Sequence, residues 1–248
     1  MRLWLPGVVA ILAAAGVSAA DDKADAVVKK AIEAHGGADN LNKYTAGKFT
    51  LKGDVSVMGM DLEFSGDAAY MPDKYRMHIE MKVMDMTITV HQVMTAGKGK
   101  RSVKVGDNVM AQDVTDEERN LALIGREIQR LTPLLDAKRF TVRGAADEDV
   151  NGKKAAVAMV TPKDFDREFK LCFDKESGLL VKTGHKAQAP GGGDVYQETL
   201  VSEYKKVNGV QVGHKIELTH DGKKFMSAKI SDVEVLEKLD DKEFKVDD

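Results

Sequence analysis

Hydrophobic and polar residues alternate along most of this chain, which predicts a fold made mainly of β-strands. The alternation is unbroken from Tyr75 to Val83, and the same period of two begins at Ala46. A period of two places successive side chains on opposite faces of a strand, so each strand has one apolar face. The pattern predicts about eleven antiparallel strands joined by short turns.

Two segments have helical periodicity instead. In residues 22–37 the apolar side chains recur at helical spacing. In residues 115–136, Thr115 and Glu118 can form a capping box, and Pro133 is expected to end or kink the helix that follows. The first helix would precede the strands and the second would be inserted between them. No internal repeat or linker divides the strands, so one strongly curved sheet fits best.

The N-terminus has the layout of a secretory signal peptide. A basic residue precedes an apolar run of about 15 residues, and small residues follow. This run is shorter than the roughly 20 residues that a spanning helix needs, so we expect cleavage near Ala19 or Ala20 and no permanent membrane anchor. The predicted parts are a signal peptide, 1–20, and one exported domain, 21–248.

Charge and cysteine content narrow the functional classes. The formal net charge is −3 and charges of both signs are interspersed, which argues against a nucleic-acid partner and against a purely electrostatic membrane attachment. Cys172 is the only cysteine, so no internal disulfide can form, and its place in a strand predicts core packing. The predicted cleavage site has no thiol that could carry a lipid.

Methionine is concentrated on the early strands. Nine of the twelve methionines lie between Met58 and Met110. Methionine adapts to irregular apolar partners, so one interpretation is a lipid or acyl-chain surface inside the curved sheet, and the other is ordinary core packed against the second helix. The same alternation places Arg76 and His78 on the opposite face. The predicted ligand-binding residues, of which the last two would lie on the lid, are Phe49, Leu51, Leu62, Phe64, Tyr75, Met77, Ile79, Met81, Met86, Ile88, Val90, Leu131 and Leu135.

The sequence predicts neither catalysis nor a metal site. His78 and Glu80 share the polar face of a strand, and no further Cys or His follows at ligand spacing, so a solvated face is expected. There is no G-x-S-x-G motif and no serine on a strand-to-helix turn. The three glycines at 191–193 do not open a helix, so they predict no phosphate cradle. We therefore expect no enzyme activity and no cofactor.

A set of short motifs is spread in order over nearly the whole chain after the signal. The motifs are AHGGADNL (34–41), MPDKYRM (71–77), VTPKD (160–164), FDKESGLLVK (173–182), YKKVNGV (204–210), KISDVEV (229–235) and DDKEF (240–244). Together they resemble the LolA/LolB-like superfamily of periplasmic lipoprotein carriers, in particular its outer membrane lipoprotein-sorting protein branch.

The resemblance implies a fold and a function. The fold would be mainly β (α+β), an unclosed antiparallel β-barrel of about eleven strands with an N-terminal helix and an inserted helix as a lid. In the family the enclosed cavity holds acyl chains, which favours the lipid interpretation of the methionines. The implied function is a soluble periplasmic carrier of lipid or lipoprotein acyl chains, with a donor or acceptor protein in the envelope. The alternative is an envelope-stress sensor or protein-partner binding module of the same fold.

The chain departs from the family pattern at two points. In well-studied carriers an arginine precedes the proline of the second motif and helps to hold the lid closed, whereas Met71 stands here. The branch often has a proline where Val212 and Gly213 stand. Control of the lid by that arginine is therefore not carried over to this chain.

Overall fold

The computed structural model describes residues 15–57, 59–189 and 192–245. The predicted signal peptide, 1–20, lies largely outside them, and its last residues belong to α1 (Ala15–Ala34), which begins earlier than the helix predicted from residue 22. No helix in the described part of the chain is long and apolar enough to cross a membrane.

Strands form the greater part of the structure. Those before the inserted helix are β1 (Ala46–Val57), β2 (Met60–Met71), β3 (Lys74–Val83), β4 (Met86–Thr95), β5 (Gly99–Val105) and β6 (Asn108–Asp113). Those after it are β7 (Phe140–Gly144), β8 (Glu148–Val150), β9 (Lys153–Pro162), β10 (Phe169–Asp174), β11 (Leu180–Gln188), β12 (Asp194–Ser202), β13 (Lys205–Val207), β14 (Val210–Val212), β15 (Lys215–His220) and β16 (Lys223–Leu236).

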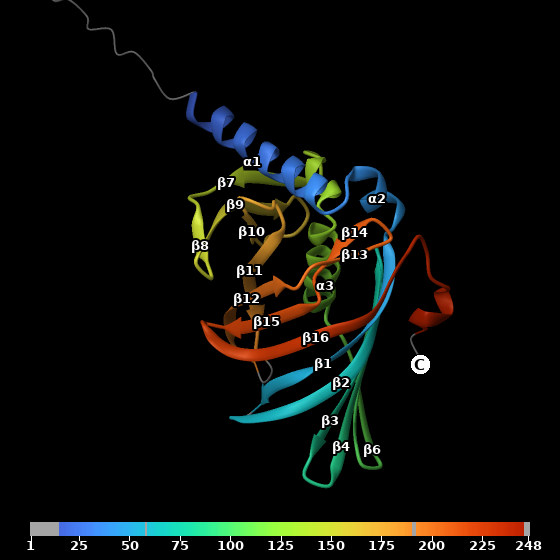
Figure 1. The fold of residues 1–248 in the computed structure, drawn as a ribbon. Helices are drawn as coiled ribbons and strands as arrows, with labels where there is room; N and C mark the ends of the chain where they lie inside the picture. Colours follow the sequence, from blue (N-terminus) through green and yellow to red (C-terminus); the bar gives the residue numbers. More distant parts are fainter. Residues whose placement is uncertain (1–14, 58, 190–191, 246–248) are drawn as a thin grey trace, which may run out of the picture.

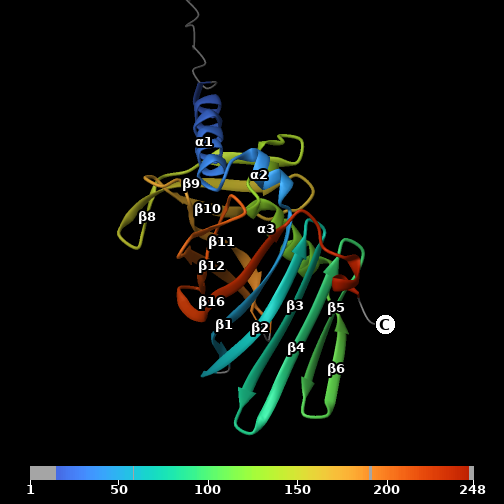
Figure 2. The same cartoon turned by 45° about the vertical axis from the view of Figure 1, so that its right-hand side comes forward.

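One antiparallel sheet of fourteen strands contains all of them except the separate pair β13 and β14. Its order is β6-β5-β4-β3-β2-β1-β16-β15-β12-β11-β10-β9-β7, with β8 paired to β9. Strands β6 and β7 are the two edges and do not pair with each other, so the sheet curves without closing (Figures 1 and 2). This is the predicted unclosed antiparallel barrel.

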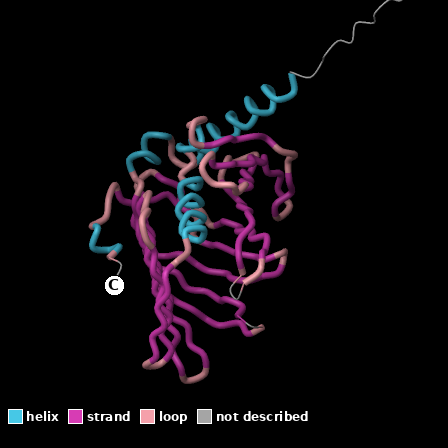
Figure 3. Tube along the Cα trace, turned by 180° about the vertical axis from the view of Figure 1, so that it is seen from behind, coloured by secondary structure: helices cyan, strands magenta, loops and turns pink. Residues whose placement is uncertain are grey.

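The helices lie at one end of the sheet and inside its curve. They are α1, α2 (Ala38–Lys43), α3 (Asp116–Gln129) and the 3₁₀ helix η1 (Thr132–Leu135). The 3₁₀ helix η2 (Asp241–Phe244) instead packs on the outer face, where Phe244 contacts Ala69 and Val93. Helix α3 runs along the inner side of the curved sheet, as Figure 3 shows from behind. It begins with the predicted capping box between Thr115 and Glu118. Because α3 ends at Gln129, Pro133 lies in η1 instead of kinking α3.

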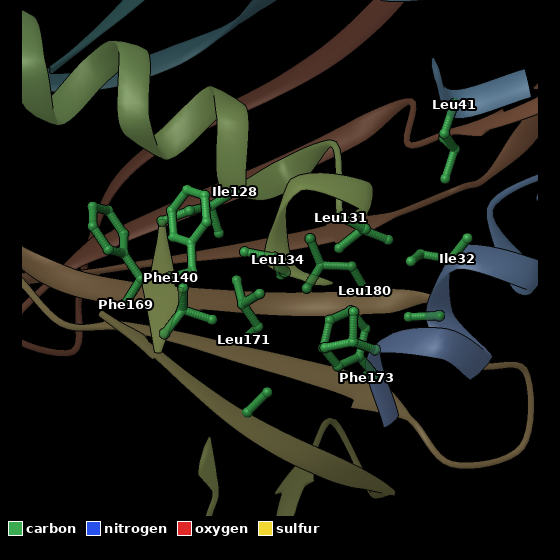
Figure 4. Packing of buried hydrophobic residues seen from close by; sticks show 14 of the residues in the cluster. Ile32, Leu41, Ile128, Leu131, Leu134, Phe140, Phe169, Leu171, Phe173 and Leu180 are labelled. Atoms are coloured by element: carbon green, nitrogen blue, oxygen red, sulfur yellow. The ribbon is translucent and has the colours of Figure 1, made fainter. Parts of the chain in front are cut away.

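The main core fills the end of the curve that these helices cover. Side chains of α1, α2, α3 and η1 point toward those of β7 and β9–β11 (Figure 4). Leu171 and Phe173 on β10 are almost fully buried there. Burial of one such side chain contributes about 1.5–3 kcal/mol, so this cluster supplies much of the stability. Cys172 is also buried, on the opposite face of β10, as predicted.

The structure divides the chain into more strands than the sequence indicated. One predicted strand separates into β12 and β13 at Glu203, which has a φ of 55°, and the next separates into β14 and β15 at Gly213. The three-residue β8 was not predicted. Alternation continues across such breaks, so periodicity alone does not locate them.

Candidate functional site

Cross-strand register brings the predicted strand residues onto one face of the sheet. Ile79 on β3 lies opposite Gly66 on β2 and Val90 on β4, and Gly66 lies opposite Leu51 on β1. Tyr75 lies on this face of β3 too, and its ring lies beside α3, so this is the inner face. We call its apolar part the methionine face, which comprises Phe49, Leu51, Phe64, Met77, Ile79, Met81, Ile88 and Val90.

The methionine face is only partly covered by other residues. Leu51, Phe64 and Ile79 are buried, and they form the centre of a hydrophobic cluster separate from the main core. The remaining members are half-buried: Phe49, Met77, Met81, Ile88 and Val90. Partial exposure of a contiguous apolar surface is typical of a binding surface.

The other predicted residues lie around this face or away from it. Leu62 and Tyr75 are half-buried on the inner face, whereas Met86 lies near the tip of the β3–β4 hairpin and is 50% exposed. Leu131 belongs to the main core, and Leu135 in η1 is 44% exposed. Both leucines follow the end of α3, so the structure places neither of them on the lid helix itself.

Two glycines permit the close strand contacts beneath this face. A Cβ on Gly66 would lie 2.0 Å from the His78 carbonyl oxygen, and one on Gly53 would lie 1.8 Å from the Ser227 carbonyl oxygen. Any larger residue would therefore push neighbouring backbones apart. Alternation of apolar and polar residues in the sequence predicts no role for these glycines.

A cavity of about 430 Å³ lies between α3 and the two walls of the curved sheet. One wall contributes Tyr75 and Met94, and the other contributes His185 and Gln197. Polar and apolar groups are about equally represented on its surface. Its lining is therefore more polar than the apolar cavity expected from the family resemblance.

Ion pairs tie α3 to both walls of this cavity. Arg101 on β5 pairs with Glu118 at 3.1 Å and also donates to the Gln92 side-chain oxygen at 3.2 Å. Arg167, before β10, pairs with Glu117. Burial raises the pKa of Glu118, but hydrogen bonds from the Thr115 backbone and from Arg101 outweigh it, so the net pKa is lowered.

The outer face of the same strands is polar, as the alternation predicted. Arg76 pairs with Asp67 at 2.6 Å, and His78 lies 3.5 Å from Glu80. A hollow of about 610 Å³ lies on this face and is lined by lysines and carboxylates in near-equal numbers, which gives it no pronounced charge preference. Among the described residues, no cluster of three His, Cys, Asp or Glu could hold a metal ion.

Sequence reasoning missed the polar residues of the cavity under α3. Arg126 is the clearest of them, since its guanidinium carbon lies 3.8 Å from the Tyr70 ring centroid. The sequence contains one indication of this cavity. Ala122, Gly125 and Arg126 recur at helical spacing, so α3 has a side of small and polar residues next to its apolar side. Small residues on an inserted helix leave space next to it.

Comparison with known proteins defines the fold. No protein-family model and no curated protein matches the sequence. Among solved structures, a DUF1329 family protein from Desulfovibrio piger aligns with a TM-score of 0.55 at 12% identity, over 90% of this chain and 97% of that one. A LolA superfamily protein from Nitrosomonas europaea gives 0.53 at 10% identity, and a domain described as outer membrane lipoprotein-sorting from Vibrio parahaemolyticus gives 0.55 at 13%, both over 90% of this chain and 97% of theirs. This chain therefore has the fold that these LolA superfamily and lipoprotein-sorting structures share.

Proposed function

We propose that this protein binds lipid, or the acyl chains of lipoproteins, on the methionine face and carries them through the periplasm without catalysing a reaction. The observation that carries the proposal is a continuous apolar surface inside the curved sheet that its own helices leave partly exposed. The fold likeness to a lipoprotein-sorting domain supports it. The predicted signal peptide supports export.

The methionine face can supply enough free energy for such binding. Each methylene group removed from water contributes about 0.8 kcal/mol, so one long chain gains roughly 10 kcal/mol before the costs of ordering. Met77 and Met81 can change rotamers to follow chains of different shape. A carrier needs this tolerance because its ligand must also leave.

The test uses two double variants of the same strand. Met77→Asp with Met81→Asp places charges on the methionine face, and His78→Asp with Lys82→Asp places charges on the outer face of β3. We expect the first variant to lose uptake of a fluorescent fatty acid at least tenfold and the second to retain it, with folded circular-dichroism spectra for both. If both variants took up the fatty acid equally well, the methionine face would not be the binding surface.

A second candidate function is binding of a protein partner through the hairpin tips. Met84 is 92% exposed at the β3–β4 tip, and Val109 and Met110 are 61% and 62% exposed beside the β5–β6 turn (Figure 2). Exposed apolar side chains gathered at one end favour a contact surface. Native mass spectrometry separates the two functions, because a carrier co-purifies with lipid and a partner module does not.

A further inference from the structure

The cavity under α3 contains one arginine side chain that forms no ion pair with any acidic residue the structure describes. Three arginines line it, and two of them are neutralised, Arg101 by Glu118 and Arg167 by Glu117. In the part of the chain that the structure describes, no carboxylate forms an ion pair with the third, Arg126. The cavity therefore retains one positive charge from its arginines.

Aromatic rings, and not acids, position Arg126. Its guanidinium carbon lies 3.8 Å from the ring centroid of Tyr70 and 5.7 Å from that of Tyr75. A guanidinium stacked on a ring still presents the N–H groups along its edge to a ligand. Burial raises the pKa of Tyr75, so its hydroxyl stays protonated and can donate a hydrogen bond as well.

The remaining polar groups do not cancel this charge. Burial and, secondarily, the charge of Arg167 lower the pKa of His185, so its imidazole is neutral at pH 7. Gln129 and Gln197 are uncharged donors that line the same cavity. An oxyanion placed here would meet one unpaired arginine and several neutral hydrogen-bond donors.

The methionine face begins where this cavity ends. Tyr75 lines the cavity, and Met77, Ile79 and Met81 follow it at intervals of two along the same face of β3. At the usual rise of a strand, the path from Tyr75 to Met81 is roughly 20 Å long. A single ligand can therefore place a polar end beside Arg126 and an apolar chain along the strand.

From this continuity we infer that the ligand of the inner face is an anionic amphiphile, whose carboxylate or phosphate group pairs with Arg126 while its chain lies along the methionine face. The inference rests on the proposed function, since it requires an apolar chain on that face. Arginine suits the role because its planar fork can bind two oxygens of one oxyanion.

The test compares a long-chain fatty acid with the fatty alcohol of equal length by isothermal titration calorimetry. We expect the unaltered protein to bind the acid about tenfold or more tightly than the alcohol. Arg126→Gln should abolish this preference by weakening binding of the acid, and a circular-dichroism spectrum like that of the unaltered protein would show that the variant is folded. Arg126→Lys should retain part of the preference. Lys104→Gln, which removes a charge from the exposed outer face of β5, should retain all of it.

Three outcomes would overturn the inference. Equal affinity of the unaltered protein for acid and alcohol would remove the role of the charge but leave the proposed lipid binding intact. Inorganic phosphate that binds at Arg126 as tightly as the fatty acid would indicate a site for a free anion. Binding of neither acid nor alcohol would contradict the proposed function as well.

Discussion

In the half of the sheet built from β7 and β9–β11, the helices press onto the inner face, and Leu171 and Phe173 are 1% and 2% exposed. In the half built from β1–β4, the same inner face holds Met77 and Met81, which are only half-buried. Both halves have apolar residues on this inner face. The difference lies in what covers the apolar face, so one half is packed core and the other is the surface to which we assign the proposed ligand.

Truncation of one side chain in each half should give the largest difference in the free energy of unfolding. Leu171→Ala leaves a cavity in close-packed surroundings, so we expect it to lower the free energy of unfolding by about 2–5 kcal/mol. Met77→Ala removes a side chain that is incompletely surrounded, and we expect a loss of about 1 kcal/mol or less. Urea unfolding of the two variants measures both losses, and similar values would mean that the methionine face is ordinary core.

In the half built from β1–β4, a glycine that permits close strand contact should contribute more to the free energy of unfolding than a side chain of the methionine face does. Gly66→Ala places a Cβ 2.0 Å from the His78 carbonyl oxygen, so β2 and β3 must separate, at a cost of about 1–3 kcal/mol. Gly97→Ala is the matched control, since its Cβ would have no atom within 4 Å. We expect little change for that variant in the same urea experiment. No loss at Gly66 would show that the curvature of this half does not depend on close strand contact.

The architecture could be predicted because alternation is a local property. A period of two located most strands, and Thr115 with Glu118 identified the start of α3. Alternation does not show where backbone conformation interrupts a strand, as it does at Glu203 with its positive φ. The end of α3 was also misplaced, because Leu131 continues the apolar spacing although it lies beyond the helix.

Only part of the candidate site could be predicted from the sequence, because alternation groups residues within single strands. The methionine face lies on consecutive strands, so its members could be grouped by alternation within each strand. The cavity under α3 instead joins Arg101, Arg126 and His185, which lie far apart in the sequence and meet only after the sheet curves. Alternation also shows which side of a strand is apolar but not how much of it a helix will cover.

The smallest predicted effect is a change of stability with pH, and it arises from a histidine in the half built from β7 and β9–β11. His35 is 7% exposed, its Nδ1 donates to the Ala31 carbonyl at 2.8 Å, and its Nε2 accepts from the Leu180 backbone N–H at 3.4 Å. Burial lowers the pKa of His35 below 6.5, although the hydrogen bond to Ala31 opposes this shift. A neutral imidazole is therefore part of the folded structure.

The pH dependence of stability follows from the direction of that shift. Below pH 6.5 the unfolded chain binds a proton at His35 more readily than the folded chain, so the free energy of unfolding falls as the pH drops from 6.5 toward the folded pKa. His35→Gln keeps an oxygen that can accept from Leu180 and does not titrate. We expect the stability advantage of the unaltered protein over this variant to shrink between pH 7 and pH 5 in urea unfolding. Other histidines with lowered pKa values, such as His185, are common to both proteins and cancel in the difference. An advantage that is constant over this range would mean that the packed half tolerates a charged His35, and that its interior is as accessible to water as the methionine face.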